Sequence, residues 1–207
     1  MTPRTWLVAA TSVLLSSAPP ARGAVIDFGG SVLGGNDAVD FSEPGELDFD
    51  AEYFLTTPIL LDVLLEAGDS MPELAFSAFF FNSSPEDWTG FRITLLGGPT
   101  FASVGDVVPE TSPFFSVAIR PDETSALISF FDFPEFSGFT LGHPTDFPDD
   151  IADGLDWYLA MNGLGPGDRF AVELRATAAP EPGLFALLGV GLLALLLPAR
   201  ERILNRR

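Results

Sequence analysis

The sequence of 207 residues contains no cysteine, no lysine and a single histidine. Without cysteine the protein has no disulfide bonds, no thiolate metal site and no thiol chemistry, so the stability of its fold has to come from packing. A metal site with two histidines is also excluded. The one imidazole, His143, lies among Gly and Pro residues, which favours an exposed loop position.

The motifs of the common enzyme classes are absent as well. The chain has no Gly-x-Ser-x-Gly nucleophile motif, no phosphate-binding loop and no dinucleotide-binding motif. Glycosidases use a pair of carboxylates at a suitable distance. Among so many acids some pair will meet this requirement by chance, so such a pair does not indicate a glycosidase. We predict no catalytic residues and no resident cofactor, and expect a protein that is not an enzyme.

Positive charge is scarce between the two ends of the chain. Residues 24–179 hold 27 Asp and Glu residues against four arginines, a net charge of −23. Such a surface repels nucleic acid and anionic membranes, and leaves divalent cations or basic partners as ligands. The alternative is that the acidity only keeps a phenylalanine-rich exported protein soluble.

The first apolar run lies at the N-terminus. Arg4 precedes the apolar stretch 6–15, and Ala21 and Gly23 supply the small side chains that signal peptidase requires. We predict a signal peptide over residues 1–23, passage through the Sec translocon and cleavage between Gly23 and Ala24.

The second apolar run lies at the C-terminus. The 15 residues 183–197 carry no charge and would span roughly 22 Å as a helix, or about 25 Å with the next two residues, against a hydrocarbon core of ~30 Å. A buried helix of a soluble core is the alternative, but such a helix would have a polar face. We predict a transmembrane helix over 183–199 and a basic cytoplasmic tail over 200–207, with Arg200, Arg202, Arg206 and Arg207 at the headgroups.

The short motif Pro180-Glu181-Pro182 stands directly before this run. Together, the motif, the Leu/Gly/Ala-rich run and the Arg-rich end resemble the PEP-CTERM sorting signal of exported bacterial proteins. The resemblance implies transient anchoring in the inner membrane, processing by an exosortase near Pro180, Glu181 and Pro182, and delivery to the cell surface or to the exopolysaccharide matrix of a biofilm.

The remaining residues form one acidic domain over 24–176, with a linker and the motif over 177–182. Alternating or short apolar segments bounded by Gly, Pro, Asn and Asp predict strands rather than helices. The predicted strands are 24–28, 46–55, 58–66, 73–81, 88–96, 114–120, 125–133, 155–161 and 168–176. This pattern predicts an all-β fold, a single β-sandwich of about eight to nine strands that is Ig-like or jelly-roll-like, with a single β-barrel as the alternative.

Within these strands the segment 46–52 alternates strictly. Glu46, Asp48, Asp50 and Glu52 fall on one face, and Leu47, Phe49 and Ala51 on the other. The pattern predicts a half-buried strand with a solvated carboxylate row outside. Trp88, at the start of a strand, is predicted to pack in the core or at a sheet edge rather than to serve as a platform for sugars.

The segment 135–154 has no hydrophobic period and is predicted to be a long loop. Its aspartates resemble the start of a calcium loop, but Ile151 and Ala160 stand where an EF-hand needs ligands. An irregular calcium site remains as a hypothesis, with Asp146, Asp149, Asp150, Asp153 and Asp156 as the candidate ligands.

For the acidic domain itself we expect a structural or adhesive role in extracellular polymeric material, with exopolysaccharide as the expected partner and no affinity for nucleic acid. One alternative is a binding module for carbohydrate or calcium. The other is a hydrolase of matrix polysaccharides, which would need a cleft lined by paired carboxylates and aromatic residues.

Overall fold

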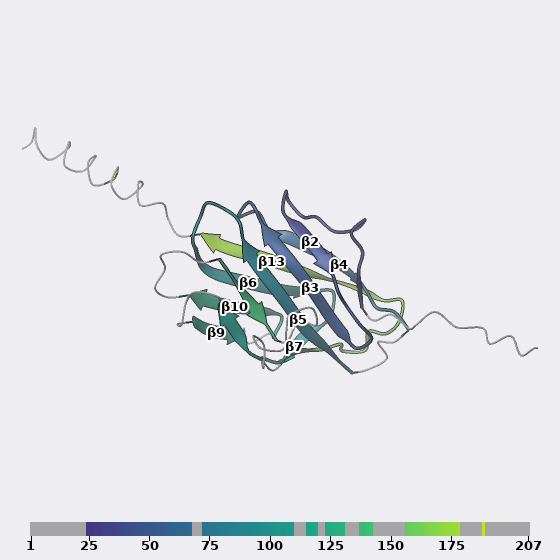
Figure 1. Cartoon of the computed structure of the whole chain (residues 1–207). Helices are drawn as coiled ribbons and strands as arrows, with labels where there is room; N and C mark the ends of the chain where they lie inside the picture. The colour runs from purple at the N-terminus through teal and green to yellow at the C-terminus, as the bar shows by residue number, and fades with distance from the viewer. Residues whose placement is uncertain are drawn as a thin grey trace, which may run out of the picture.

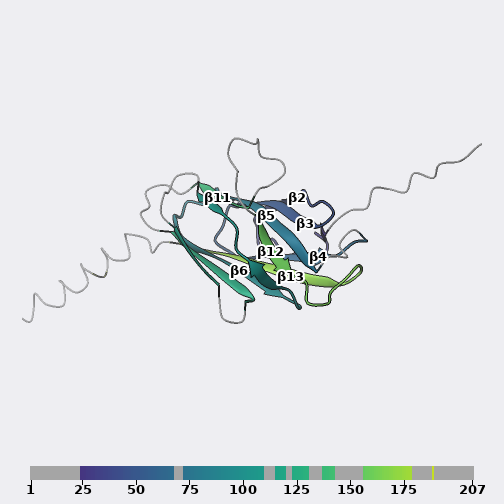
Figure 2. The same cartoon turned by 90° about the horizontal axis from the view of Figure 1, so that it is seen from below.

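The computed structural model describes residues 24–67, 72–109, 115–119, 123–130, 137–142 and 156–178, together with Leu188. The described part is all-β and its strands form two sheets (Figure 1). Seen from below, the two sheets lie as two layers (Figure 2). The prediction of an all-β domain is therefore confirmed.

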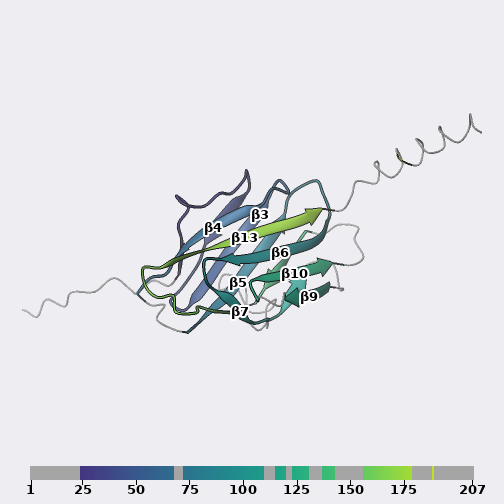
Figure 3. The same ribbon diagram turned by 180° about the vertical axis from the view of Figure 1, so that it is seen from behind.

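Sheet A has six strands, and every neighbouring pair in it is antiparallel. Figure 3 shows this sheet from its outer side. Its strands, in spatial order, are β1 (Val25–Ile26), β4 (Ile59–Leu64), β13 (Arg169–Ala178), β6 (Trp88–Leu96), β10 (Ser125–Phe130) and β9 (Phe115–Ile119).

Sheet B has seven strands and one parallel pair, β3 with β5. Strand β5 is bordered on its other edge by two short strands, β12 along its first half and β11 along its second. The spatial order is β2 (Asp37–Asp40), β3 (Glu46–Tyr53), β5 (Glu73–Asn82), β11 (Gly138–Leu141) and β8 (Val107–Pro109), with β12 (Trp157–Ala160) paired to β5 and to β7 (Thr100–Ser103).

The core lies between the two sheets and is rich in aromatic rings. Tyr53 of β3 contacts Trp88 and Phe91 of β6 edge-on, with ring centroids 5.1 and 5.7 Å apart. Phe80 of β5 lies 4.6 Å from Phe91 and 4.8 Å from Phe139. The contacts of Tyr53 and Phe80 with β6 cross from sheet B to sheet A, whereas Phe80 and Phe139 both belong to sheet B. Burial of aromatic surface therefore holds the two layers together. Trp88 is fully buried, which confirms its predicted core position.

The predicted strands reappear in the structure, and the segment 58–66 forms strand β4. The estimate of eight to nine strands was too low, because the described residues already form thirteen strands. Four were not predicted: β2, β7, β8 and β11. Strand β11 lies inside the segment predicted to be a loop, and that part of the loop prediction is wrong.

The two ends of the domain can be compared with their predicted limits. Ala24 is the first described residue and is fully buried. Strand β13 continues to Ala178, so residues 177 and 178, predicted to be linker, pair with β6. No helix among the described residues is long and apolar enough to cross a membrane. Of the predicted span 183–199 only Leu188 is described.

Candidate functional site

The structure covers only part of the residues that the sequence singled out. Of the five candidate calcium ligands it describes Asp156, whereas Asp146, Asp149, Asp150 and Asp153 lie outside the described residues. The same holds for His143, for Gly23, for the motif 180–182 and for the four tail arginines. Within the described ranges no three acidic or histidine side chains are arranged to hold a metal ion.

The carboxylate row of β3 faces outward from sheet B, as its alternation predicted. Its inward partners Leu47, Phe49 and Ala51 are fully buried. The prediction of a solvated row is wrong at Asp48, which is also fully buried, while Glu46, Asp50 and Glu52 are half-buried. The reason is that β3 is an inner strand, with β2 along one edge and β5 along the other.

A buried hydroxyl joins one carboxylate of this row to a carboxylate outside it. Ser77 of β5 has its Oγ 3.0 Å from Oε1 of Glu46 and 3.2 Å from Oδ1 of Asp156. Glu46 and Ser77 lie on the parallel pair β3 and β5, and Asp156 directly precedes β12. A serine has one hydroxyl proton, so it can donate to only one of the two carboxylates at a time.

The environment of Glu46 favours its protonated form. Burial raises the pKa of Glu46, and the neighbouring charges of Asp48, Asp156 and Glu43 raise it further, whereas the hydrogen bond from Ser77 opposes the shift. A proton on Glu46 would relieve the repulsion and supply a second donor to the group. We call Glu46, Ser77 and Asp156 the carboxyl cluster.

The carboxyl cluster is not arranged as a nucleophile with its base. Ser77 is fully buried in the sheet and its neighbours are acidic groups, which accept its proton in a hydrogen bond but lack the basicity to remove it. Within the described residues the cluster acts as a polar contact that ties β3, β5 and the start of β12 together.

A shallow pocket lies at the edge of sheet B, between β2, β3 and β5. It has a volume of about 120 Å³. Its lining residues are Asp37, Ala38, Val39, Asp50, Glu52 and Phe81. This volume is well below the 300 to 1,000 Å³ of ordinary small-molecule sites. Glu52 is also already engaged, because the hydroxyl of Ser83 donates to it. The pocket therefore does not have the size of a substrate cleft.

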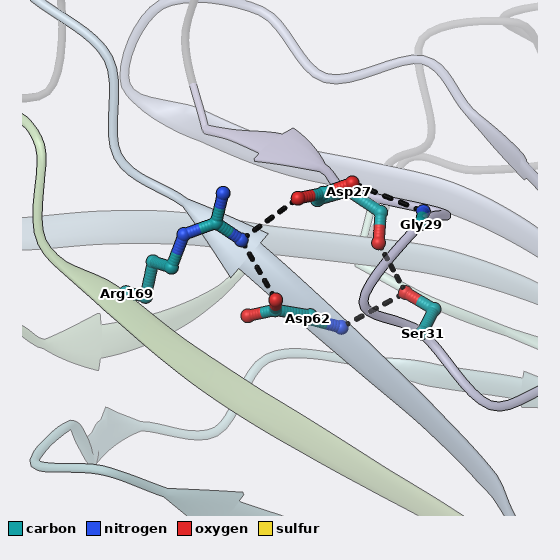
Figure 4. A network of polar contacts seen from close by, with 5 residues as sticks. All are labelled: Asp27, Gly29, Ser31, Asp62 and Arg169. Atoms are coloured by element: carbon teal, nitrogen blue, oxygen red, sulfur yellow. Dashed lines mark hydrogen bonds and ion pairs between the residues drawn. The ribbon is translucent and has the colours of Figure 1, made fainter.

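An ion-pair network lies on the outer side of sheet A (Figure 4). Nη1 of Arg169 contacts Oδ2 of Asp27 at 2.9 Å and Oδ2 of Asp62 at 2.7 Å. The hydroxyl of Ser31 completes the network, since it donates to the carbonyl of Asp27 and accepts from the amide of Asp62. We call Asp27, Ser31, Asp62 and Arg169 the β1 clamp, because it fixes the segment after β1 against β4 and β13.

The electrostatics of the β1 clamp are those of a structural ion pair. The hydrogen bond from Arg169 lowers the pKa of Asp27, helped by the amide of Gly29. Conversely, the pairing raises the pKa of Arg169. Sequence reasoning missed this network because its members are separated by up to 142 positions, from Asp27 to Arg169.

Comparisons with known proteins add no assignment. No family model matches the chain, and no curated protein or solved structure matches it either. Function is therefore inferred from the chain's own sequence and geometry.

Proposed function

We propose that this chain is an exported bacterial protein that is sorted by a PEP-CTERM tail and displayed at the cell surface or in the exopolysaccharide matrix of a biofilm. Signal peptidase removes residues 1–23 after passage through the Sec translocon. The helix 183–199 then holds the protein in the inner membrane until an exosortase processes it near Pro180, Glu181 and Pro182. The acidic domain is a β-sandwich, Ig-like or jelly-roll-like, with a structural or adhesive role.

The observation that carries this proposal is the three-part tail. A motif of Pro180, Glu181 and Pro182, an uncharged run of 15 residues and an end with four arginines follow one another without a gap. Each part meets a separate requirement, namely recognition, membrane insertion and orientation with the positive end inside.

The C-terminal end of the folded domain supports the proposed position of the sorting signal. Strand β13 ends at Ala178, two residues before Pro180. The proposed processing site therefore lies directly after the last strand, outside the sheet.

The test is deletion of residues 180–207 followed by cell fractionation and mass measurement of the mature protein. We expect the truncated protein to leave the membrane fraction and to be lost from the surface and the matrix. A matched variant with Arg200, Arg202, Arg206 and Arg207 replaced by Gln keeps the motif and the apolar run, and should impair orientation and processing only. Unchanged location and mass after the deletion would refute the sorting proposal.

A further inference from the structure

Two arginines lie directly opposite each other in the middle of sheet A. Arg92 of β6 is the register partner of Arg175 of β13, although the two are 83 positions apart in the chain. Their strand neighbours Phe91, Ile93 and Leu174 are fully buried, so both arginines lie on the outer face of the sheet. We call Arg92 and Arg175 the arginine pair.

The arginine pair is without partners among the described residues. No hydrogen bond or ion pair joins either guanidinium to any residue in the described ranges, whereas Arg169 holds two carboxylates. Glu173 lies on the same face, two positions before Arg175, and also forms no ion pair there. Like charges directly opposite each other in a sheet are destabilising, and this domain has 27 acids with which to neutralise them.

The surface beside the arginine pair carries hydroxyl groups. The neighbouring row across four strands consists of Thr177, Gly90, Ser129 and Ser116. Gly90 has no side chain, and a Cβ there would come 3.0 Å from the carbonyl oxygen of Ile128. A strip thus runs across β13, β6, β10 and β9, with two guanidiniums along one side and hydroxyls along the other.

We propose that this strip binds an acidic polysaccharide, with the arginine pair taking carboxylates of its uronate sugars and the Thr and Ser hydroxyls taking sugar hydroxyls. Planar guanidiniums match carboxylates with two parallel hydrogen bonds, and these charge-assisted bonds are the strong ones. Neighbouring strands are ~4.8 Å apart, close to the length of one sugar in a chain. The choice of a matrix polysaccharide as the source of the carboxylates rests on the proposed function.

The positive charge of the strip is confined to the arginine pair, and this limits the affinity that we expect for a polyanion. The domain as a whole repels polyanions, so we expect weak binding at the arginine pair. A polymer raises the apparent affinity of this one strip only by offering it many equivalent sites. A duplex nucleic acid has a continuous row of phosphates, of which two cations would neutralise very few, and the surrounding acids would repel the rest.

The test uses the full-length chain in a neutral detergent and measures its retention by immobilised polygalacturonate, with dextran as the neutral polymer. Arg92→Gln and Arg175→Gln are each expected to weaken binding about tenfold, the ratio that corresponds to ~1.4 kcal/mol. Arg169→Gln is the matched control, because it removes the same charge from an arginine that is already paired. It should change binding less than twofold.

Two further variants guard against a folding artefact. Arg92→Lys and Arg175→Lys keep the charge but lose the planar fork, and we expect binding between that of wild type and that of the Gln variants. Near-ultraviolet circular dichroism of every variant should match wild type, because both side chains lie on the outer face.

Several results would overturn the proposal. These are no retention on polygalacturonate, equal retention on dextran, equal competition by duplex DNA, or an equal loss of binding in Arg169→Gln. The chain could also form a dimer in the absence of polymer. If Arg92→Gln made that dimer dissociate, the strip would bind a second copy of the chain instead of a polysaccharide. The sorting proposal is judged separately, because deletion of 180–207 leaves the strip intact and these variants leave the tail intact.

Discussion

A partly buried carboxyl group with a raised pKa lowers the stability of the folded protein at neutral pH. Glu46 is such a group, because its burial and its acidic neighbours disfavour the ionised form. In the unfolded chain the same group has a pKa near the reference value of 4.5. The folded state therefore binds the proton more tightly, and stability falls as the pH rises from about 4.5 through the folded pKa.

The first prediction concerns this residue. Glu46→Gln removes the ionisation but keeps an oxygen that accepts from Ser77, so we expect the variant to be more stable than wild type at pH 7 by about 0.5 kcal/mol, the size of interactions between half-exposed groups. The gain should vanish below pH 4.5. Urea unfolding at several pH values measures it. The control is Glu52→Gln, on the same face of β3, and an equal gain there would point to net charge alone.

A second prediction tests the aromatic core. Phe80 is fully buried and its ring contacts Phe49, Phe91 and Phe139, two of them within sheet B and one in sheet A. We expect Phe80→Ala to lower the free energy of unfolding by about 3 to 5 kcal/mol, through lost burial and the cavity left behind. Urea unfolding measures the change, and a loss below ~1 kcal/mol would mean that the two sheets are not held by this ring.

At the scale of the elements, β11 shows how tightly the short strands are fitted. Gly138 pairs with Phe81, and a side chain at Gly138 would overlap the carbonyl oxygen of Phe80. Backbone atoms of an inner strand cannot move aside without breaking the ladder. Only glycine is therefore compatible with β11 at this position.

The third prediction follows from this contact. Gly138→Ala is expected to destabilise the protein by about 1 to 3 kcal/mol, as overpacking does in other cores, and to speed hydrogen exchange in β11. Gly165→Ala is a matched control, since nothing lies within 4 Å of a Cβ at that position. If both variants unfold at the same urea concentration, the close approach of β11 to β5 has no energetic consequence.

The β1 clamp yields the fourth prediction. Without Arg169 the segment after β1 loses the ion pairs to Asp27 and Asp62, so Arg169→Gln should speed hydrogen exchange at Val25 to Asp27 severalfold and leave β6 unchanged. Because the paired Asp27 has a lowered pKa, the clamp contributes above pH 3.8 and is lost as the pH falls further. Exchange rates that are equal in wild type and variant would show that the clamp does not hold β1.

Most of the elements that the sequence predicted have a long or strict apolar period. Strands β3 to β6, β10 and β13 have six to ten residues each, and their inward and outward faces follow the alternation. The four missed strands have three or four residues, too few for a period to show. In β11 the neighbouring Gly, Pro and Asp residues also favoured a loop prediction.

The candidate sites were less predictable than the elements, because they depend on strand pairing. The outward direction of Asp48 follows from its place in β3, but its burial depends on the neighbouring strands β2 and β5. The arginine pair and the β1 clamp join residues 83 and up to 142 positions apart. No local pattern marks such contacts, since register is decided by the whole sheet.

At the scale of the whole molecule the two outer faces differ in charge. Sheet B carries the carboxylate row of β3, with the carboxyl cluster and the shallow acidic pocket beside it. Sheet A carries the arginine pair, whereas its third arginine, Arg169, is neutralised by Asp27 and Asp62. The domain therefore has one strongly acidic side, and on its other side the arginine pair is a local positive charge, although the net charge of residues 24–179 is −23.

The last prediction concerns this excess of negative charge. Repulsion among 27 acids destabilises the compact state, and salt screens it over a Debye length of ~10 Å at 0.1 M. We therefore expect the Tm to rise when NaCl is increased from about 10 to 200 mM. Magnesium chloride at the same ionic strength should act in the same way, because both salts screen without requiring a site.

Calcium distinguishes general screening from a site. The calcium hypothesis for Asp146, Asp149, Asp150, Asp153 and Asp156 predicts that millimolar calcium raises the Tm beyond the value in magnesium at equal ionic strength, because only a bound ion stabilises by its own affinity. It also predicts slower proteolysis of segment 143–155. Substitution of the five aspartates by Asn should abolish the calcium increment and keep the response to NaCl. Equal Tm values in calcium and magnesium would contradict the hypothesis, and the acidity would then serve solubility alone.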